Sequence, residues 1–231
     1  MRRTWVVVFV VVVCIAIGGF IVLRMSAGES AAGGPAAGQL APGREGMTQI
    51  LTAREGRYTL EGWSHQGPGG FNLDSATGVL TGYGGMGLLW YDVRELGDFT
   101  LELDFRCADS ATNSGVFLRV PGVPTSDEYI YHSFEIQIDD SGEGIHHTGA
   151  VYDAQAPTVH AAVPPGGWNH YAITFRGGHI TVDLNGTRVV DWDAEPRGKV
   201  RDFAPRGYIG LQNHDDRSPV QFRNIWVREL S

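Results

Sequence analysis

Alternation between apolar and polar residues is the feature that most restricts how this chain can fold. From residue 58 onward a period of two recurs along short segments, and no stretch shows the 3.6-residue period of an amphipathic helix. Glycine-containing turns, such as Arg176-Gly177-Gly178 and Asn185-Gly186, separate the segments. The clearest expected strands are Phe99–Arg106, Ser114–Val120, Ser133–Asp139, His170–Arg176, His179–Asn185, Gly207–Gln212 and Val220–Leu230. This pattern predicts an all-β, two-sheet antiparallel sandwich, of a length that suits a jelly roll.

The N-terminal 24 residues form a separate segment with a different pattern. Arg2 and Arg3 precede an uninterrupted apolar run of 19 residues, Trp5–Leu23. As a helix this run would span about 28 Å, close to the hydrocarbon thickness of a bilayer. The two arginines favour a cytoplasmic N-terminus, so we expect a single-pass transmembrane helix in the cell membrane and an extracytoplasmic domain. A cleaved signal and a secreted domain stay open, because small residues follow at Ser26-Ala27-Gly28.

Residues 25–46 are mostly alanine, glycine, serine and proline, which predicts a flexible linker. The folded domain is expected over residues 47–231. The chain carries a net charge of −8, and the domain alone has 14 basic and 24 acidic residues, a balance of −10. Such a surface argues against nucleic acid as a partner of the domain. The two cysteines, Cys14 and Cys107, offer no disulfide framework, and the alternation around Cys107 predicts a buried thiol.

The alternation also assigns side chains to the faces of the expected sheets. Along Ser133–Asp139 the apolar side chains all fall on one face, and the polar side chains fall on the other. If the three strands 114–120, 133–139 and 207–212 are neighbours, their polar faces combine into one cluster. An ordinary solvated face is the alternative. The residues assigned to the polar side are Arg119, Ser133, Glu135, Gln137, Asp139, Gln212 and His214.

Seven motifs occur in order along the chain. They are Asn113-Ser-Gly-Val-Phe-Leu-Arg119, Phe134-Glu-Ile-Gln-Ile-Asp-Asp140, Thr148-Gly-Ala-Val-Tyr152, Pro165-Gly-Gly-Trp-Asn169, Leu184-Asn-Gly186, Gly210-Leu-Gln-Asn-His214 and Val220-Gln-Phe-Arg-Asn-Ile225. Together they resemble the signatures of a known family, the 3-keto-disaccharide hydrolases. The resemblance runs from Glu61 to Leu230 and implies a concanavalin A-like jelly roll.

The resemblance implies cleavage of glycosidic bonds in sugars already oxidised to a ketone at carbon 3. A carbonyl at carbon 3 acidifies the proton on carbon 2, so a base can remove that proton and the substituent on carbon 1 can depart. Addition of water to the resulting enone completes a net hydrolysis. The chemistry needs a general base, stabilisation of the enolate and an acid for the leaving oxygen. An enzyme that oxidises sugars at carbon 3 is implied as a functional partner.

Mapped through these motifs, the expected catalytic residues are Glu135, Asp139 and His214. Glu135 or Asp139 would be the base or a metal ligand. The expected substrate-binding residues are Arg119, Gln137, Tyr152 and Gln212. Carboxylates and a histidine are compatible with a divalent metal ion, although no spacing specifies one. The chain departs from the family pattern at Val163, where many relatives carry a basic residue, and this departure bears on substrate range.

Two other functions are weighed against this one. A laminarinase-like retaining glycosidase would pair Glu135 with Asp139, but four residues of extended strand separate them by about 13 Å. Retaining catalysis places its two carboxyl groups about 5–5.5 Å apart, so we reject that assignment. The second alternative is a non-catalytic carbohydrate-binding or laminin-G-like module. It would use tryptophans as platforms for sugar rings, the candidates being Trp63, Trp90, Trp168, Trp192 and Trp226.

Overall fold

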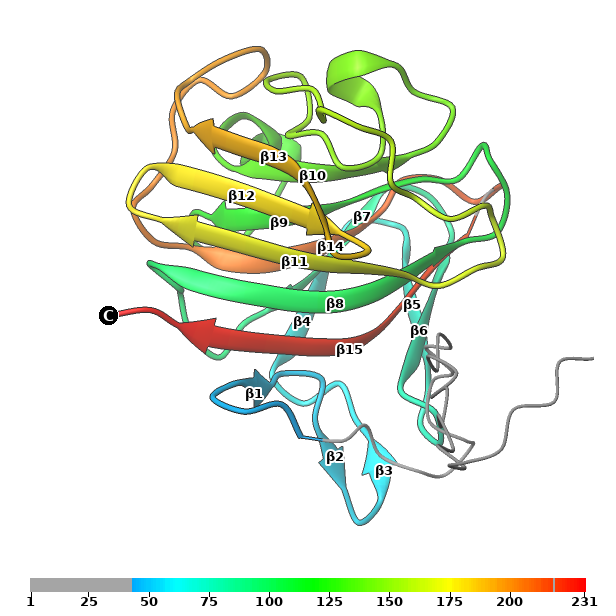
Figure 1. Ribbon diagram of the computed structural model, residues 1–231. Helices are drawn as coiled ribbons and strands as arrows, with labels where there is room; N and C mark the ends of the chain where they lie inside the picture. The colour runs from blue at the N-terminus through cyan, green and yellow to red at the C-terminus, as the bar shows by residue number, and fades with distance from the viewer. Residues whose placement is uncertain (1–42, 218) are drawn as a thin grey trace, which may run out of the picture. The chain divides into compact units, whose positions relative to one another are not determined.

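The computed structural model describes residues 43–217 and 219–231 (Figure 1). The expected membrane segment and most of the expected linker lie outside these residues. Within the described part of the chain, no helix is both long enough and apolar enough to cross a membrane. The first strand of the described residues, β1, begins at Thr48.

The fold is an all-β sandwich whose strand pairings are all antiparallel, as the alternation predicted. The larger sheet has the order β13-β12-β11-β8-β15-β6-β5, with β1 also pairing with β15. The two-residue strands β2 and β3 form a separate hairpin. The bounds in the larger sheet are β1 Thr48–Gln49, β5 Gly70–Asp74, β6 Val79–Tyr83, β8 Phe99–Cys107, β11 Asn169–Arg176, β12 His179–Leu184, β13 Thr187–Asp193 and β15 Val220–Glu229; the hairpin consists of β2 Ala53–Arg54 and β3 Arg57–Tyr58.

The smaller sheet has five strands in the order β10-β9-β14-β7-β4. Short 3₁₀ helices, η1 and η2, lie on either side of β10 in the sequence. All seven expected strands are present, within one or two residues of their expected ends, and β1 to β7 and β13 are additional. The bounds are β4 Trp63–Gln66, β7 Gly87–Tyr91, β9 Asn113–Val120, β10 Phe134–Asp139, β14 Tyr208–Asn213, η1 Asp127–Tyr131 and η2 Gly144–His146.

The core lies between the two sheets and is built from the alternating residues of their inner faces. Every second side chain of β8, from Phe99 to Phe105, is fully buried, and Cys107 is buried as predicted. The ring of Phe105 packs on that of Tyr171 in β11, with centroids 4.6 Å apart. The Tyr171 hydroxyl then donates to the carbonyl oxygen of Gln137 in β10 at 2.7 Å. This bond ties the two sheets together directly behind the polar face of β10.

A second apolar cluster covers part of the outer face of the five-stranded sheet. It consists of Leu88, Trp90, Phe117, Val120 and Tyr129. Tyr129 belongs to η1, and its ring meets the ring of Phe117 edge to face at 4.9 Å. The 3₁₀ helix is therefore held down on the sheet by aromatic packing, and it forms a wall beside the polar residues of β10.

Candidate active site

The registers of β10, β9 and β14 place three polar strands side by side on the outer face of the smaller sheet. Gln137 is opposite Gly115, and Glu135 is opposite Phe117. On the other side of β9, Phe117 is opposite Gly210, which brings Gln212 level with Gly115. Neighbouring strands lie about 4.8 Å apart, so the two glutamines face each other across a glycine. The sheet itself thus brings Glu135, Gln137 and Gln212, three members of the predicted polar cluster, onto one face.

Gly115 leaves the floor of this cluster open. A Cβ atom at this position would lie 1.9 Å from the Oε1 atom of Glu135. The side chain of Glu135 therefore lies over the glycine, in space that any other residue would fill. A glycine inside a strand commonly marks such a close approach.

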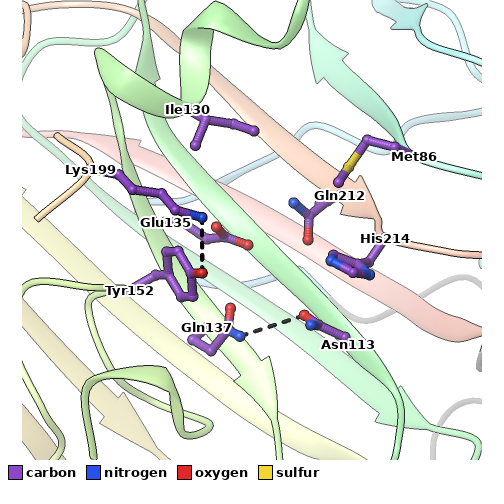
Figure 2. Close-up of a pocket in the computed structure, with 9 residues that line it drawn as sticks. All are labelled: Met86, Asn113, Ile130, Glu135, Gln137, Tyr152, Lys199, Gln212 and His214. Atoms are coloured by element: carbon purple, nitrogen blue, oxygen red, sulfur yellow. Dashed lines mark hydrogen bonds between the residues drawn. The ribbon is translucent and has the colours of Figure 1, made fainter. Parts of the chain in front are cut away.

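The surrounding side chains enclose a pocket of about 340 Å³, open solvent at its mouth included. Strands β9, β10 and β14 supply the floor, and η1 and the segments around residues 86, 152 and 199 supply the walls. Figure 2 shows Tyr152 and Lys199 beside Glu135, with Gln212 and His214 on the opposite side. The lining residues are Met86, Asn113, Ile130, Glu135, Gln137, Tyr152, Lys199, Gln212 and His214.

Glu135 is the most perturbed acid of the pocket. Its side chain is almost completely buried, with 7% of the residue exposed. Burial raises the pKa of its carboxyl group to about 8, and the positive charge of Lys199 opposes this rise. No side chain or backbone group of the described residues donates a hydrogen bond to the carboxyl oxygens. A buried carboxyl group without a partner, in a pocket, is a strong candidate for chemistry.

Two buried glutamines in the same pocket also have unused hydrogen-bonding capacity. The Oε1 atoms of Gln137 and Gln212 are both buried and lack a partner among the described residues. The amide nitrogen of Gln137 lies 3.5 Å from Oδ1 of Asn113, which orients the amide. Buried polar atoms in native proteins are nearly always paired, so these oxygens are suited to accept hydrogen bonds from a ligand.

Tyr152 reaches the pocket from a segment that runs along the outer edge of β10. Its backbone nitrogen donates to the carbonyl oxygen of Glu135 at 2.8 Å, and the neighbouring Val151 forms a bridge with Ile136. The Nζ atom of Lys199 lies 3.1 Å from the Tyr152 hydroxyl oxygen and 4.9 Å from the centre of its ring. On the other side the ring of His146 packs at 5.0 Å. Tyr152 is thus fixed beside the buried acid.

The family of the 3-keto-alpha-glucoside-1,2-lyase-like domain matches residues 52–228 of the chain. The chain belongs to this family. The match covers every strand from β2 to β14 and most of β15, so the pocket lies wholly within the family domain. Among curated proteins, none matches the sequence.

Solved structures share the fold of this family member. Two candidate glycosyl hydrolases from Parabacteroides distasonis resemble it with TM-scores of 0.67 and 0.61 at 21% and 29% identity. The first alignment covers 81% of this chain and 95% of the other chain, and the second covers 80% and 99%. The carbohydrate-binding module CBM66 from Bacillus subtilis resembles it with a TM-score of 0.52 at 15% identity, over 73% of this chain and 96% of the module.

Five of the seven expected site residues line the pocket, and Arg119 is not among them. Alternation along β9 predicted that Arg119 would share the outer face with Phe117. Instead its φ of +57° and a register shift between β14 and β9 break the alternation. The guanidinium group donates to the carbonyl oxygens of Gly97 and Gly177 and pairs with Asp98 at 3.0 Å. It also lies over the ring of Phe175, so Arg119 is part of the packed interior.

Asp139 is the other expected site residue that does not line the pocket. It ends β10, and its Oδ1 atom accepts hydrogen bonds from the backbone nitrogens of Ser141 and Gly142 and from the Ser141 hydroxyl. An aspartate with these partners stabilises the turn that follows the strand. The expectation that Asp139 is a base or metal ligand therefore receives no support from its surroundings, and Glu135 is the better candidate.

Four lining residues were not among the expected site residues: Met86, Asn113, Ile130 and Lys199. Asn113 carried a usable signal, since it precedes Gly115 by two positions and so shares its face. Lys199 comes from the irregular segment between β13 and β14, where no periodicity links it to β10. Val163, the departure from the family pattern, does not line this pocket.

No three histidine, cysteine, aspartate or glutamate side chains converge on a common point within the residues that the structure describes. His146 and His147, which are adjacent in the sequence, have separate surroundings. The ring of His146 contacts Tyr152, whereas the ring of His147 stacks on that of His160 at 3.8 Å. His214 has its Nδ1 atom 3.3 Å from Asp215 at the far side of the pocket.

Proposed function

We propose that this protein cleaves the glycosidic bonds of sugars that carry a ketone at carbon 3, with Glu135 as the base that removes the proton from carbon 2. The observation that carries the proposal is the buried Glu135 carboxyl group without a hydrogen-bond partner, whose pKa lies at about 8. Membership of the 3-keto-alpha-glucoside-1,2-lyase-like family supports this substrate class and reaction.

A base of this kind suits the chemistry. The carbon 2 proton next to a ketone is weakly acidic, so a base with a raised pKa drives its removal better than an ordinary carboxylate. With a pKa of about 8, about a tenth of the Glu135 side chains are ionised at pH 7. The ammonium group of Lys199 supports that ionised form. Removal of the proton places negative charge on the oxygen at carbon 3, where a donor is needed.

Gln137 and Gln212 are assigned to binding of the sugar. Their buried Oε1 atoms need donors, which sugar hydroxyl groups provide, and their amide nitrogens can donate to sugar oxygens. The two side chains extend from β10 and β14 on either side of β9, so a sugar ring over Gly115 would lie between them. We assign the amide of Gln212, for which no acceptor is found in the described residues, to the enolate oxygen.

The expected anchor suggests where the reaction takes place. We propose that the run Trp5–Leu23 holds the domain at the extracytoplasmic face of the cell membrane, where a dehydrogenase acting on carbon 3 would supply its substrate. Protease added to intact cells should degrade the domain under this proposal. A domain that resists the protease until the cells are lysed would contradict it.

Turnover of a ketosugar tests the proposed reaction. The full chain is purified in detergent, because of its apolar N-terminal segment, and incubated with a 3-keto-glucoside and with the parent glucoside. We expect release of the aglycone from the 3-keto compound alone, with formation and later hydration of the enone. Equal cleavage of both compounds would contradict proton removal at carbon 2, since the parent compound lacks the activating ketone.

A non-catalytic carbohydrate-binding module is the second candidate. The similarity in fold to CBM66 and the unpaired glutamine oxygens of the pocket favour it. The tryptophans give it less support: Trp63, Trp90 and Trp226 are buried, and Trp168 is stacked against Arg106 and Arg223. Tight binding of the 3-keto-glucoside and the parent glucoside without turnover of either would favour this candidate.

A further inference from the structure

Tyr152 has a hydroxyl group that is oriented to donate a proton within the pocket. The ammonium group of Lys199 donates a hydrogen bond to the phenol oxygen at 3.1 Å. An ammonium group has no lone pair, so it cannot accept the hydroxyl proton of Tyr152 in return. No other acceptor for that proton is found among the described residues. The O–H bond of Tyr152 is therefore available to a bound substrate.

Lys199 is suited to stabilise negative charge and unsuited to act as a nucleophile. The hydrogen bond to Tyr152 raises the pKa of Lys199, and the neighbouring acids Asp153 and Glu135 contribute to the rise. A lysine that attacks a ketone to form a Schiff base must be neutral, which requires the opposite shift. The ammonium group instead faces the oxygen of Tyr152, where it would oppose the charge of a phenolate.

The backbone places this pair at a fixed position relative to Glu135. Tyr152 is hydrogen-bonded through its backbone nitrogen to the carbonyl of Glu135, so the two side chains leave adjacent, paired segments. Figure 2 shows Lys199, Tyr152 and Glu135 together on one side of the pocket. In a 3-keto-glycoside the leaving oxygen is attached to carbon 1, next to the carbon 2 atom that faces the base. An acid beside Glu135 is therefore well placed for that oxygen.

We propose that Tyr152 is the acid that protonates the departing oxygen at carbon 1, and that Lys199 stabilises the resulting phenolate. This inference rests on the function proposed above. Glu135 takes the proton from carbon 2, and the electrons of that C–H bond form the enolate of the carbon 3 ketone. The carbon 3 carbonyl then re-forms, the enolate electrons move to the bond between carbons 1 and 2, and the bond from carbon 1 to oxygen breaks with its electron pair on oxygen. Tyr152 transfers its proton to that oxygen.

The addition of water restores both groups. Water gives one proton to the Tyr152 phenolate as its oxygen bonds to carbon 1, and protonated Glu135 returns its proton to carbon 2. The sum is one water consumed, a free 3-keto sugar, the released alcohol and an unchanged enzyme. His214 is the alternative acid, because its side chain also lines the pocket and can donate a proton. It lies on the opposite side, beside Asp215.

Leaving groups of different basicity distinguish the two acids. An alkoxide is a strong base that departs poorly without a proton, whereas 4-nitrophenolate departs without one. The Tyr152→Phe variant of the full chain should therefore lose about 10²-fold or more in kcat/KM on a methyl 3-keto-glucoside, in the range of general acid catalysis. It should lose less than about 10-fold on the 4-nitrophenyl compound. Lys199→Met should show the same selectivity to a smaller degree, and His214→Gln should show none.

Exchange of hydrogen for deuterium at carbon 2 distinguishes protonation of the leaving oxygen by Tyr152 from stabilisation of the enolate. In D₂O, Tyr152→Phe should still exchange the carbon 2 proton of the methyl compound for deuterium, because Glu135 is intact. If Tyr152→Phe loses activity equally on both substrates and also loses the exchange, the proposal is overturned. Unchanged activity of Tyr152→Phe would overturn it as well. So would a loss in His214→Gln that is larger for the methyl compound than for the 4-nitrophenyl compound. Lys199→Met gives an independent reading if Tyr152→Phe does not fold. A wild-type chain that cleaves neither substrate would instead refute the proposed function.

Discussion

The outer faces of the two sheets each carry a carboxyl group that is largely withdrawn from solvent, half-buried for Asp104 and buried for Glu135, and the surroundings of the two groups are opposite. On the eight-stranded sheet, Asp104 accepts hydrogen bonds from His170 at 2.9 Å and from Asn224 at 2.7 Å, and it pairs with Arg223 at 3.2 Å. On the five-stranded sheet, Glu135 has no such partner among the described residues. Asp104 lies on β8, an interior strand of its sheet, whereas Glu135 lies on β10, the edge strand of the smaller sheet.

The two pKa shifts express this contrast. Burial would raise the pKa of Asp104, but hydrogen bonds from His170 and Asn224 and the nearby positive charges lower it below its usual value. Burial raises the pKa of Glu135 to about 8, and the charge of Lys199 alone opposes that rise. A buried acid with a full set of partners stabilises the fold, whereas a buried acid without partners makes folding less favourable. The second arrangement is typical of a functional site.

The largest effect that this comparison predicts is on catalysis. Glu135→Gln should lower kcat on a 3-keto-glucoside by about 10³-fold, because an amide cannot take the carbon 2 proton. The variant should be at least as stable as the wild type, since it removes a buried ionisable group. Asp104→Asn is the matched control and should keep its kcat within about 2-fold. A large loss in Asp104→Asn with none in Glu135→Gln would reverse the roles of the two faces.

Filling the floor of the pocket should have the next largest effect. Gly115→Ala introduces a Cβ atom where the Glu135 carboxyl group lies, so we expect about a 10²-fold loss in kcat/KM from displacement of the base. Gly178→Ala serves as the control, because nothing lies within 4 Å of a Cβ atom added there. Equal activity of the two variants would show that the position of Glu135 over Gly115 does not matter for turnover.

On the other face the expected effect is on stability. Asp104→Asn should lower the free energy of unfolding by about 2 kcal/mol at pH 7, the magnitude of hydrogen bonds to a charged group. Because folding lowers the pKa of Asp104, its contribution to the free energy of unfolding is present above the usual pKa of 3.8 and is lost as the pH falls through the lower pKa of the folded state. Urea denaturation of the wild type and of Asp104→Asn should thus show a difference in unfolding free energy that is smaller at pH 3 than at pH 7. A larger difference at pH 3 would contradict the pairing of Asp104 with its partners.

The smallest effect distinguishes an unpaired glutamine from a paired one. Gln212→Leu should lower kcat/KM for the ketosugar by about 10-fold and leave stability nearly unchanged, because its Oε1 atom has no partner to lose. Gln221→Leu, on the eight-stranded sheet, breaks hydrogen bonds with Arg106 and Thr81. It should lower stability by about 1 kcal/mol with kcat/KM unchanged. The opposite pattern in the two variants would argue that Gln212 has no part in binding.

Regular structure determines what could be predicted from the sequence. Strict alternation identified the strands and placed Glu135, Gln137 and Gln212 on one face, because side chains in a strand alternate and neighbouring registers follow from the same pattern. Arg119 was assigned wrongly, since one residue with a positive φ breaks the alternation without any mark in composition. Lys199 could not be found, because it enters the pocket from an irregular segment whose path depends on tertiary contacts.

The pH dependence of kcat/KM for the wild-type chain on a 3-keto-glucoside tests the central claim most directly. Since Glu135 acts as a base only when ionised, kcat/KM should rise about tenfold per pH unit below its pKa and level off above about pH 8. The residual activity of Glu135→Gln should lack this rise. A wild-type profile that falls over the same range, or that stays level from pH 6 to about pH 9, would contradict Glu135 as the base.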